Sequence, residues 1–240
     1  MNNKRGSMGR VEQNCYNRER LLYKFLSPPL PLFHNPREKL IEKTIPTGRW
    51  NLYVGGAGNS VPGYVNVDLF DLPGVDVVCS VERLPFKDSI FTRVECDAVL
   101  EHVARPEMAV SEIRRCLING GVAHFVVPFC HPFHEYPRDF RRYTPDGMAQ
   151  LLSEFHVIDE GWRTGPTATW LVFTLEYAKL WFRSRWLKRL SYLLLGWMLF
   201  PLRYFDVLLL RKADARQIGN HYYVYAKKES ATGEPSTQAS

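Results

Sequence analysis

Residues 51–68 read NLYVGGAGNSVPGYVNVD, and this sequence contains two strand patterns separated by a glycine-rich turn. Residues 51–54 form a short apolar run that ends in the glycine-rich turn 55–58, which is typical of a strand leading into a loop. Residues 64–68 then alternate like a second strand that finishes on Asp68, ten residues after the last glycine of the turn. Dinucleotide-binding units place this acid about 20 residues beyond the loop, after a full helix that holds the pyrophosphate. The shorter spacing therefore favours a ligand that has an adenosine but no phosphates.

Further strands and helices alternate along the rest of the chain. The strands are expected at residues 75–79, 93–99, 122–127, 155–161 and 221–227. One helix is expected from Pro106 to Asn119-Gly120, and a second begins at Thr144-Pro145, a cap followed by a proline at the first helical position. Strands that alternate with helices predict a mostly parallel sheet with helices on both faces. Such sheets bind ligands outside the carboxyl ends of their strands.

The charge of the chain is distributed unevenly, and this bears on its partners. The 240 residues carry a formal net charge of +6, but residues 51–162 have a net charge of −7, and the excess lies in residues 1–50 (+6) and 163–220 (+7). An acidic central block argues against a groove that follows nucleic-acid phosphates, so we expect no nucleic-acid partner. The five cysteines include no CxxC pair and the polar start has no apolar signal core, so we expect a cytoplasmic protein without disulfides.

S-adenosylmethionine is a ligand with an adenosine and no phosphates, and its sulfonium cation suits an acidic block. Several motifs in order resemble class I S-adenosylmethionine-dependent methyltransferases, and within them the type 11 methyltransferase group. The motifs are residues 51–58, PGYVNVD (62–68), VERLPF (81–86), VLEHV (99–103) and LINGG (117–121). The stretch 131–147 is similar to members found alongside polysaccharide and glycolipid biosynthesis. The resemblance implies a Rossmann-like α/β fold whose sheet is mostly parallel with an antiparallel last strand.

The same resemblance implies a cofactor site at the strand ends. Its expected members are Gly55, Gly56, Ala57, Asp68, Ser80, Val81, Glu82 and Asp97. The loop at residues 55–57 would pack under the methionine and ribose of S-adenosylmethionine, Asp68 would hold the ribose hydroxyls, and residues 80–82 would border the adenine. Ala57 stands where relatives have a loop glycine, and Ser80 stands where many have an aspartate, so some of the expected cofactor contacts are weakened.

Residues 131–143, which follow the fifth strand, hold the densest cluster of polar side chains. His134 is the preferred general base, because an imidazole titrates near ~6.5 and accepts a proton at neutral pH. Asp139 would orient His134 or bind a sugar hydroxyl, and Arg142 would hold an anionic group of the substrate. The alternative is a hydrogen-bonded corner in which Asp139 pairs with the arginines.

Other histidines are expected to have structural roles. The run from His131 to Glu135 has the letters of a zinc motif, but Pro132 breaks the helical geometry that such a motif needs, so no metal is expected. We expect His102 to fix the loop after the fourth strand, and His124 to be a core residue with a satisfied hydrogen bond.

Residues 163–220 separate the last two strands, which are close neighbours in the fold that the chain resembles. This insertion contains four tryptophans, basic residues, and 13 uncharged residues at 190–202, fewer than the ~20 that a membrane-spanning helix needs. We expect helices that lie in the interface of an anionic membrane. A helical cap on the sheet, a dimer interface and a pair of re-entrant helices are the alternatives.

The expected organisation is a basic helical arm at 1–48, a cofactor-binding domain at 49–162 and 221–228, the insertion at 163–220, and a disordered tail at 229–240. The expected function is transfer of a methyl group from S-adenosylmethionine to a hydroxyl of a glycan or lipid-linked acceptor, on the inner face of the cell membrane. The alternatives are a carbon or nitrogen acceptor such as a quinone precursor, and a non-catalytic membrane-associated partner that keeps the fold.

Overall fold

The structure is a computed structural model that describes residues 34–135 and 137–229. Most of the expected N-terminal arm and of the expected tail lies outside the described residues. The chain divides into two compact units, which are described separately. Among the described residues, the sheet unit contains 37–128, 134–135, 137–161 and 222–229, and the helical unit contains 34–36, Phe129–Phe133 and Trp162–His221. The insertion expected from residue 163 thus coincides with most of the helical unit.

The sheet has seven strands in the order β3-β2-β1-β4-β5-β7-β6. They are β1 (Asn51–Val54), β2 (Val65–Asp68), β3 (Val77–Val78), β4 (Phe91–Asp97), β5 (Leu117–Pro128), β6 (His156–Thr164) and β7 (His221–Lys227). The pairs β1 with β2, β1 with β4, β2 with β3, and β4 with β5 are parallel. Strand β7 is antiparallel to β5, since Lys228 after the end of β7 exchanges backbone hydrogen bonds with Gly120 and Gly121 near the start of β5. The expected Rossmann-like class I methyltransferase sheet is confirmed.

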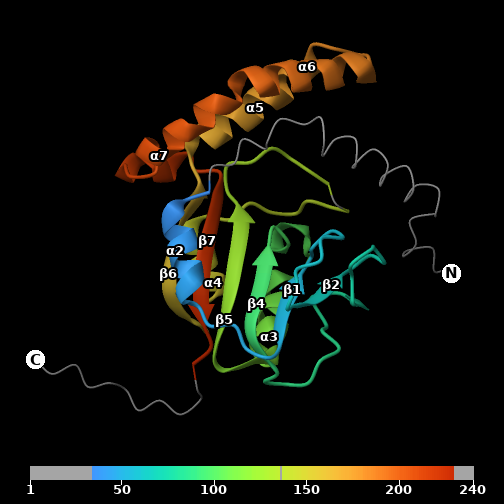
Figure 1. Cartoon of the computed structure of the whole chain (residues 1–240), viewed down its shortest axis with the longest axis vertical. Helices are drawn as coiled ribbons and strands as arrows, with labels where there is room; N and C mark the ends of the chain where they lie inside the picture. The colour runs from blue at the N-terminus through green and yellow to red at the C-terminus, as the bar shows by residue number, and fades with distance from the viewer. Residues whose placement is uncertain (1–33, 136, 230–240) are drawn as a thin grey trace, which may run out of the picture. The chain divides into compact units, whose positions relative to one another are not determined.

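Helices flank this sheet on both faces, with α2 (Pro36–Thr44) in front and α3 (Pro106–Cys116) and α4 (Pro145–Leu151) behind it in Figure 1. The side chain of Thr144 accepts a hydrogen bond from the backbone N–H of Gly147, which is the expected N-cap of α4. Helix α3 ends at Cys116, so the end expected at Asn119-Gly120 is wrong. Gly120 instead lies inside β5 with a φ of +80°, where the pairing with β4 shifts register.

The core between α2 and the sheet contains a buried polar network. Ile41 of α2 and Ile45, directly after the end of this helix, pack toward apolar side chains of β5 and β7. Nδ1 of the buried His124 lies 2.6 Å from Oε2 of Glu95, and the imidazole stacks on Tyr225 at a centroid distance of 4.1 Å. His124 is therefore a hydrogen-bonded core residue, as its place in an apolar strand predicted.

The helical unit is built around two packed helices, α5 (Pro166–Leu180) and α6 (Arg185–Leu199), drawn side by side in Figure 1. The chain continues through the short helices η2 (Phe200–Phe205), α7 (Asp206–Leu209) and η3 (Ala213–Gln217). The fully buried carboxylate of Asp206 accepts hydrogen bonds from the backbone N–H groups of Thr167 and Ala168, at 2.8 and 3.0 Å. A negative charge at this position stabilises the N-terminus of α5 and fixes the start of α7 to it.

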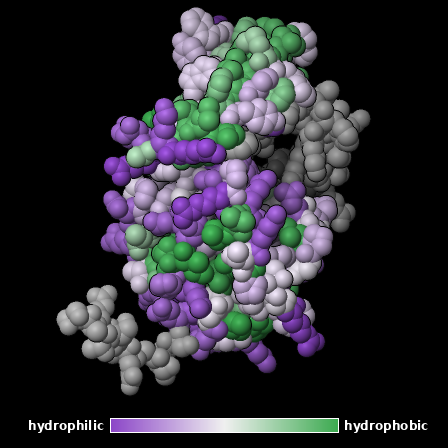
Figure 2. All heavy atoms as spheres, turned by 60° about the vertical axis from the view of Figure 1, so that its left-hand side comes forward, coloured by the Kyte–Doolittle hydropathy of each residue, from purple (hydrophilic) through white to green (hydrophobic). Residues whose placement is uncertain are grey.

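The surface of the helical unit is rich in exposed apolar side chains, part of which Figure 2 shows as green spheres. Trp181 and Trp186 flank the turn between α5 and α6 and are 72% and 66% exposed. The helical segments from Arg185 to Leu209 run on for 25 residues, and by length and composition alone this stretch is sufficient to cross a membrane. The sequence prediction that the apolar run is too short to span a membrane was based only on its 13 uncharged residues. The helical stretch extends beyond these residues on both sides.

Candidate active site

A cavity of about 330 Å³ opens at the carboxyl ends of β1, β2 and β4 in the sheet unit. This is where parallel α/β sheets bind their ligands. The residues that line it include six of the eight expected cofactor-binding residues, namely Gly55, Ala57, Asp68, Ser80, Val81 and Glu82. Gly56 and Asp97 are not among the described residues that line the cavity, and their part in cofactor binding stays a prediction. A Cβ on Gly56 would lie 2.7 Å from the carbonyl oxygen of Asn59, which indicates that this glycine shapes the turn.

The loop after β1 is held in a conformation that leaves room beside its backbone. Gly55 has a φ of +71°, and a Cβ at this position would lie 2.3 Å from Cγ2 of Val99. Ala57 has a φ of +47°, a left-handed conformation that costs a non-glycine residue roughly 1–2 kcal/mol. Its backbone N–H donates to Oδ2 of Asp68 at 2.9 Å, which offsets part of this cost. The loop is thus fixed before a ligand arrives.

Asp68 has the geometry of a ribose-binding carboxylate. It is buried at the end of β2, where Oδ2 accepts from Ala57 and Oδ1 accepts from the backbone N–H of Phe70 at 3.0 Å. Each carboxylate oxygen has two lone pairs, so both retain capacity for a ligand hydroxyl. The tight approach at Gly55 and the acceptor capacity of Asp68 fit an adenosine in this cavity.

The expected adenine side of the cavity is built from residues 80–82. Val81 is buried and supplies an apolar surface. The carboxylate of Glu82 accepts from the backbone N–H of Arg105 at 3.0 Å and pairs with its guanidinium at 2.6 Å. The hydroxyl of Ser80 accepts from the backbone N–H of Glu82 at 3.2 Å. These contacts fix residues 80–82 to the turn that begins α3.

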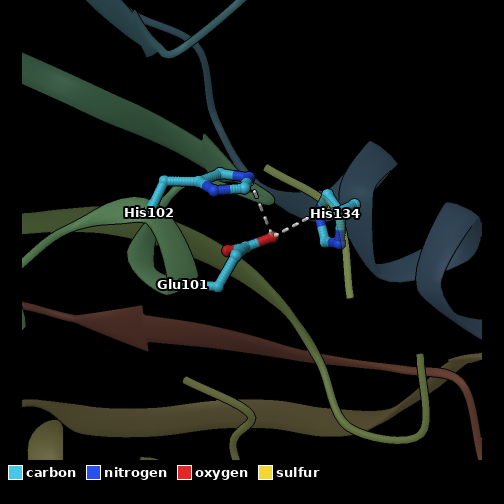
Figure 3. Close-up of side chains that lie close together, drawn as sticks. All are labelled: Glu101, His102 and His134. Atoms are coloured by element: carbon cyan, nitrogen blue, oxygen red, sulfur yellow. Dashed lines mark ion pairs between the residues drawn. The ribbon is translucent and has the colours of Figure 1, made fainter. Parts of the chain in front are cut away.

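A cluster of three ionisable side chains borders the cavity, drawn in Figure 3. Glu101 and His102 lie in η1 (Leu100–His102), directly after β4, and His134 lies in the loop after β5. Oε1 of Glu101 is 3.8 Å from Nε2 of His134 and 3.9 Å from Nε2 of His102. His102 itself lines the cavity. The cluster therefore lies beside the expected methyl donor.

The surroundings of this cluster alter its protonation. Burial raises the pKa of Glu101 to about 8, because a carboxylate loses its hydration when it is buried. Burial also lowers the pKa of His102 and favours its neutral form. The Nδ1 atom of His102 donates to the backbone carbonyl of Arg138 at 2.5 Å, so His102 ties the segment after β4, which it was expected to fix, to the loop after β5.

Asp139 contacts His134 directly, and Arg142 contacts Asp139. Oδ2 of Asp139 accepts from the backbone N–H of His134 at 2.8 Å and lies 3.5 Å from its Nδ1 atom. Both carboxylate oxygens of Asp139 also pair with Arg142, at 2.5 and 2.7 Å, and the hydrogen bonds from Arg142 lower the pKa of Asp139 to about 2. Asp139 is thus close enough to orient His134, and its pairing with Arg142 is also what the alternative, a hydrogen-bonded corner, predicted. Arg142 pairs with Asp139, and its expected contact with an anionic group of the substrate stays a prediction.

The sequence singled out His134 but missed its partner Glu101 and gave His102 only a structural role. The available signal was the adjacent Glu-His pair directly after the fourth strand, at the sheet edge where ligands bind. His131, the other histidine of the apparent zinc motif, belongs to the helical unit, where its Nδ1 atom lies 3.1 Å from Oδ1 of Asn220.

Comparisons with known proteins agree with this geometry. The family described as Methyltransferase domain matches residues 64–125, which include β2, β4 and the cluster residues of η1. A search of curated proteins finds no match. The match to this family implies S-adenosylmethionine as the cofactor, and the cavity at the strand ends has the residues to hold it.

Solved structures with the same fold include two that span most of the chain. A Burkholderia thailandensis 1,6-didemethyltoxoflavin-N1-methyltransferase, with its substrate and S-adenosylhomocysteine bound, has 13% identity and a TM-score of 0.54, and the alignment covers 91% of this chain and 85% of that one. The [4+2]-cyclase SpnF has 14% identity and a TM-score of 0.50, with 95% and 85% covered. At this identity the likeness shows the fold, and a fold alone does not fix the reaction.

Proposed function

We propose that this protein is an S-adenosylmethionine-dependent methyltransferase that acts on a hydroxyl of a glycan or lipid-linked acceptor at the cytoplasmic face of a membrane. The observation that carries the proposal is the cluster of Glu101, His102 and His134 at the border of the cavity that contains Asp68. A cavity for the methyl donor and side chains that handle a proton are the two parts that O-methylation requires.

The cofactor-binding part of the mechanism depends on residues 55–82. When bound, S-adenosylmethionine supplies a methyl group carried on a sulfonium sulfur. The backbone of the loop after β1 and the carboxylate of Asp68 orient its adenosine, and the apolar side chain of Val81 keeps water from the ring. Holding the donor in one orientation removes much of the entropic cost of the reaction.

The acceptor side depends on the cluster. As the acceptor oxygen forms its bond to the methyl carbon, the electron pair of the carbon–sulfur bond passes to sulfur, and the acceptor loses its hydroxyl proton. Nε2 of His134 faces Glu101 in the cluster and is the atom expected to receive this proton directly. Asp139, which is paired with Arg142, keeps the imidazole in position. His134→Ala should therefore reduce turnover more than it reduces binding of S-adenosylmethionine.

The membrane part of the proposal rests on the helical unit. Trp181 and Trp186 are exposed beside Arg183 and Arg185, which are also exposed. Tryptophan rings favour the depth of lipid headgroups, and arginines favour anionic lipids. An acceptor that carries a lipid would be found at the same surface.

The proposal is tested by incubating the protein with methyl-labelled S-adenosylmethionine and a lipid-glycan extract, then identifying what becomes methylated. We expect label on an oxygen of a lipid-soluble glycan, and far less of it with His134→Ala. Label on a nitrogen or carbon atom would show that the acceptor class is wrong. Equal turnover by wild type and His134→Ala would show that His134 has no part in handling the proton.

A further inference from the structure

Three side chains that can bind metals meet at the border of the cavity. One ligand atom from each of Glu101, His102 and His134 lies within 4.8 Å of the others. Figure 3 shows both imidazoles turned toward the same carboxylate oxygen of Glu101, at 3.8 and 3.9 Å. Atoms that each lie roughly 2.1 Å from one ion are at most roughly 4.2 Å apart. A small inward movement of the side chains therefore brings all three to ligating distance.

The outer nitrogen of each imidazole faces an acceptor, as in most metal-binding histidines. Nδ1 of His102 donates to the carbonyl of Arg138, and this leaves a lone pair on Nε2, the atom that faces Glu101. Nδ1 of His134 lies 3.5 Å from Oδ2 of Asp139, while its Nε2 faces Glu101. Both rings thus present the nitrogen suited to ligation toward the same point.

Glu101 is the second, independent sign of a ligand. Its side chain is fully buried. Apart from its own backbone amide, no described residue makes a hydrogen bond to either carboxylate oxygen. A buried carboxylate without hydrogen-bond donors is costly, and buried charges in proteins are usually paired or bind metals. The two histidines that face Glu101 are themselves suited to ligate a metal.

From this arrangement we infer that Glu101, His102 and His134 form a binding site for one divalent first-row transition-metal ion beside the cofactor cavity. Two imidazoles and one carboxylate favour ions such as Zn²⁺, Mn²⁺, Fe²⁺ or Co²⁺. Mg²⁺ and Ca²⁺ prefer oxygen ligands and are disfavoured by the two nitrogens. Three protein ligands leave coordination positions open on the ion.

The role of the ion, unlike its binding, rests on the proposed function. An open coordination position directed at the cavity would hold the acceptor oxygen and make its proton easier to lose. With the ion bound, His134 would position it as a ligand and the proton of the acceptor hydroxyl would pass to solvent water, whereas without the ion His134 would accept this proton itself. Binding of the metal does not depend on methyl transfer, so the two claims can be tested separately.

The test uses the full-length protein, freed of metals with a chelator and titrated with CoCl2 while its visible absorption is recorded. We expect one Co²⁺ per chain, with absorption bands of nitrogen and oxygen ligation and without the intense near-ultraviolet band of a cysteine thiolate. ZnCl2 should displace the Co²⁺ and abolish the spectrum. The absence of saturable binding at one equivalent would overturn the inference.

Variants assign the ligands. His134→Gln and His102→Gln, whose side chains are partly exposed, should each weaken Co²⁺ binding by at least roughly tenfold. Glu101→Gln should do the same, and the two histidine variants keep the test decisive if this buried substitution prevents folding. The matched controls are His156→Gln and Glu107→Gln, which are exposed and lie outside the cluster, and both should bind Co²⁺ normally. Binding that the cluster variants leave unchanged would place the ion elsewhere and overturn the inference.

Binding of S-adenosylmethionine to the same chelated protein separates this inference from the proposed function. If the cofactor binds and Co²⁺ does not, the metal site is wrong and the proposed function remains. If Co²⁺ binds at the cluster and S-adenosylmethionine does not, the metal site is supported and the proposed function is wrong.

Discussion

The backbone N–H of Ala57 donates a hydrogen bond to Oδ2 of Asp68 at 2.9 Å. This bond joins the loop after β1 to the end of β2. It also holds Ala57 in its left-handed conformation and orients the Asp68 carboxylate in the cavity. One contact thus shapes the loop and prepares the group expected to bind the ribose.

Asp68→Ala should weaken binding of S-adenosylmethionine by roughly 10- to 100-fold, because a buried hydrogen bond to a charged group contributes about 1.5–3 kcal/mol. Equilibrium dialysis with labelled cofactor measures the loss. Asp88→Asn, at an exposed aspartate paired with Arg115, is the matched control and should bind normally. Equal affinities of wild type and Asp68→Ala would exclude Asp68 from the cofactor site.

Gly55→Ala should lower both stability and cofactor affinity. The new Cβ would lie 2.3 Å from Cγ2 of Val99, and the φ of +71° adds strain, for a total cost of about 2–4 kcal/mol. Gly63→Ala is the control, since its φ of +82° is strained but nothing lies within 4 Å of the added Cβ, so it should cost only about 1–2 kcal/mol. Urea unfolding compares the two, and an equal loss would show that the approach to Val99 is unimportant.

The stability of the sheet unit should fall in acid because of Glu95. Burial by itself would raise the pKa of Glu95, but the hydrogen bond and charge of His124, with the charge of Arg93, outweigh it and leave this pKa below its usual value. A lowered folded-state pKa contributes stability that is present above the unfolded-state value and is lost as the pH falls through the folded-state value. His124→Phe should therefore cost about 1–3 kcal/mol at neutral pH and less in acid. Urea unfolding at several pH values measures this, and a pH-independent cost would contradict it.

Trp181→Ala with Trp186→Ala should reduce binding to anionic liposomes. Each exposed tryptophan that enters the lipid interface contributes apolar burial, and loss of the pair should lower the partition coefficient by at least roughly tenfold. Cosedimentation at low salt is the measurement. Trp50→Ala, at an exposed tryptophan of the sheet unit, is the control. If wild type stays in the supernatant, the membrane interpretation is wrong.

The sequence predicted the parts of the fold that depend on local pattern. The apolar run before Gly55 and the alternation before Asp68 are strong strand signals, and both strands are present. The helix end predicted at Asn119-Gly120 was wrong, because a glycine with positive φ ends helices and also occurs at irregularities within strands. Its position inside β5 depends on pairing with β4, a long-range contact that local pattern does not contain.

Only part of the candidate site could be predicted from the sequence, because the rest depends on long-range contacts. Asp68 lies at a strand end and could be placed from topology alone. The cluster combines Glu101, directly after β4, with His134, 33 residues further along the chain in an irregular loop. Pairing between such segments depends on how the loop folds back, through contacts such as that of Asp139 with the His134 amide.

Calorimetric titration of the folded protein with S-adenosylmethionine measures whether the cavity beside Asp68 binds this cofactor. We expect saturable binding at one molecule per chain, with competition by S-adenosylhomocysteine. If protein shown to be folded by circular dichroism gives no heat of binding, the cavity beside Asp68 is not a site for S-adenosylmethionine.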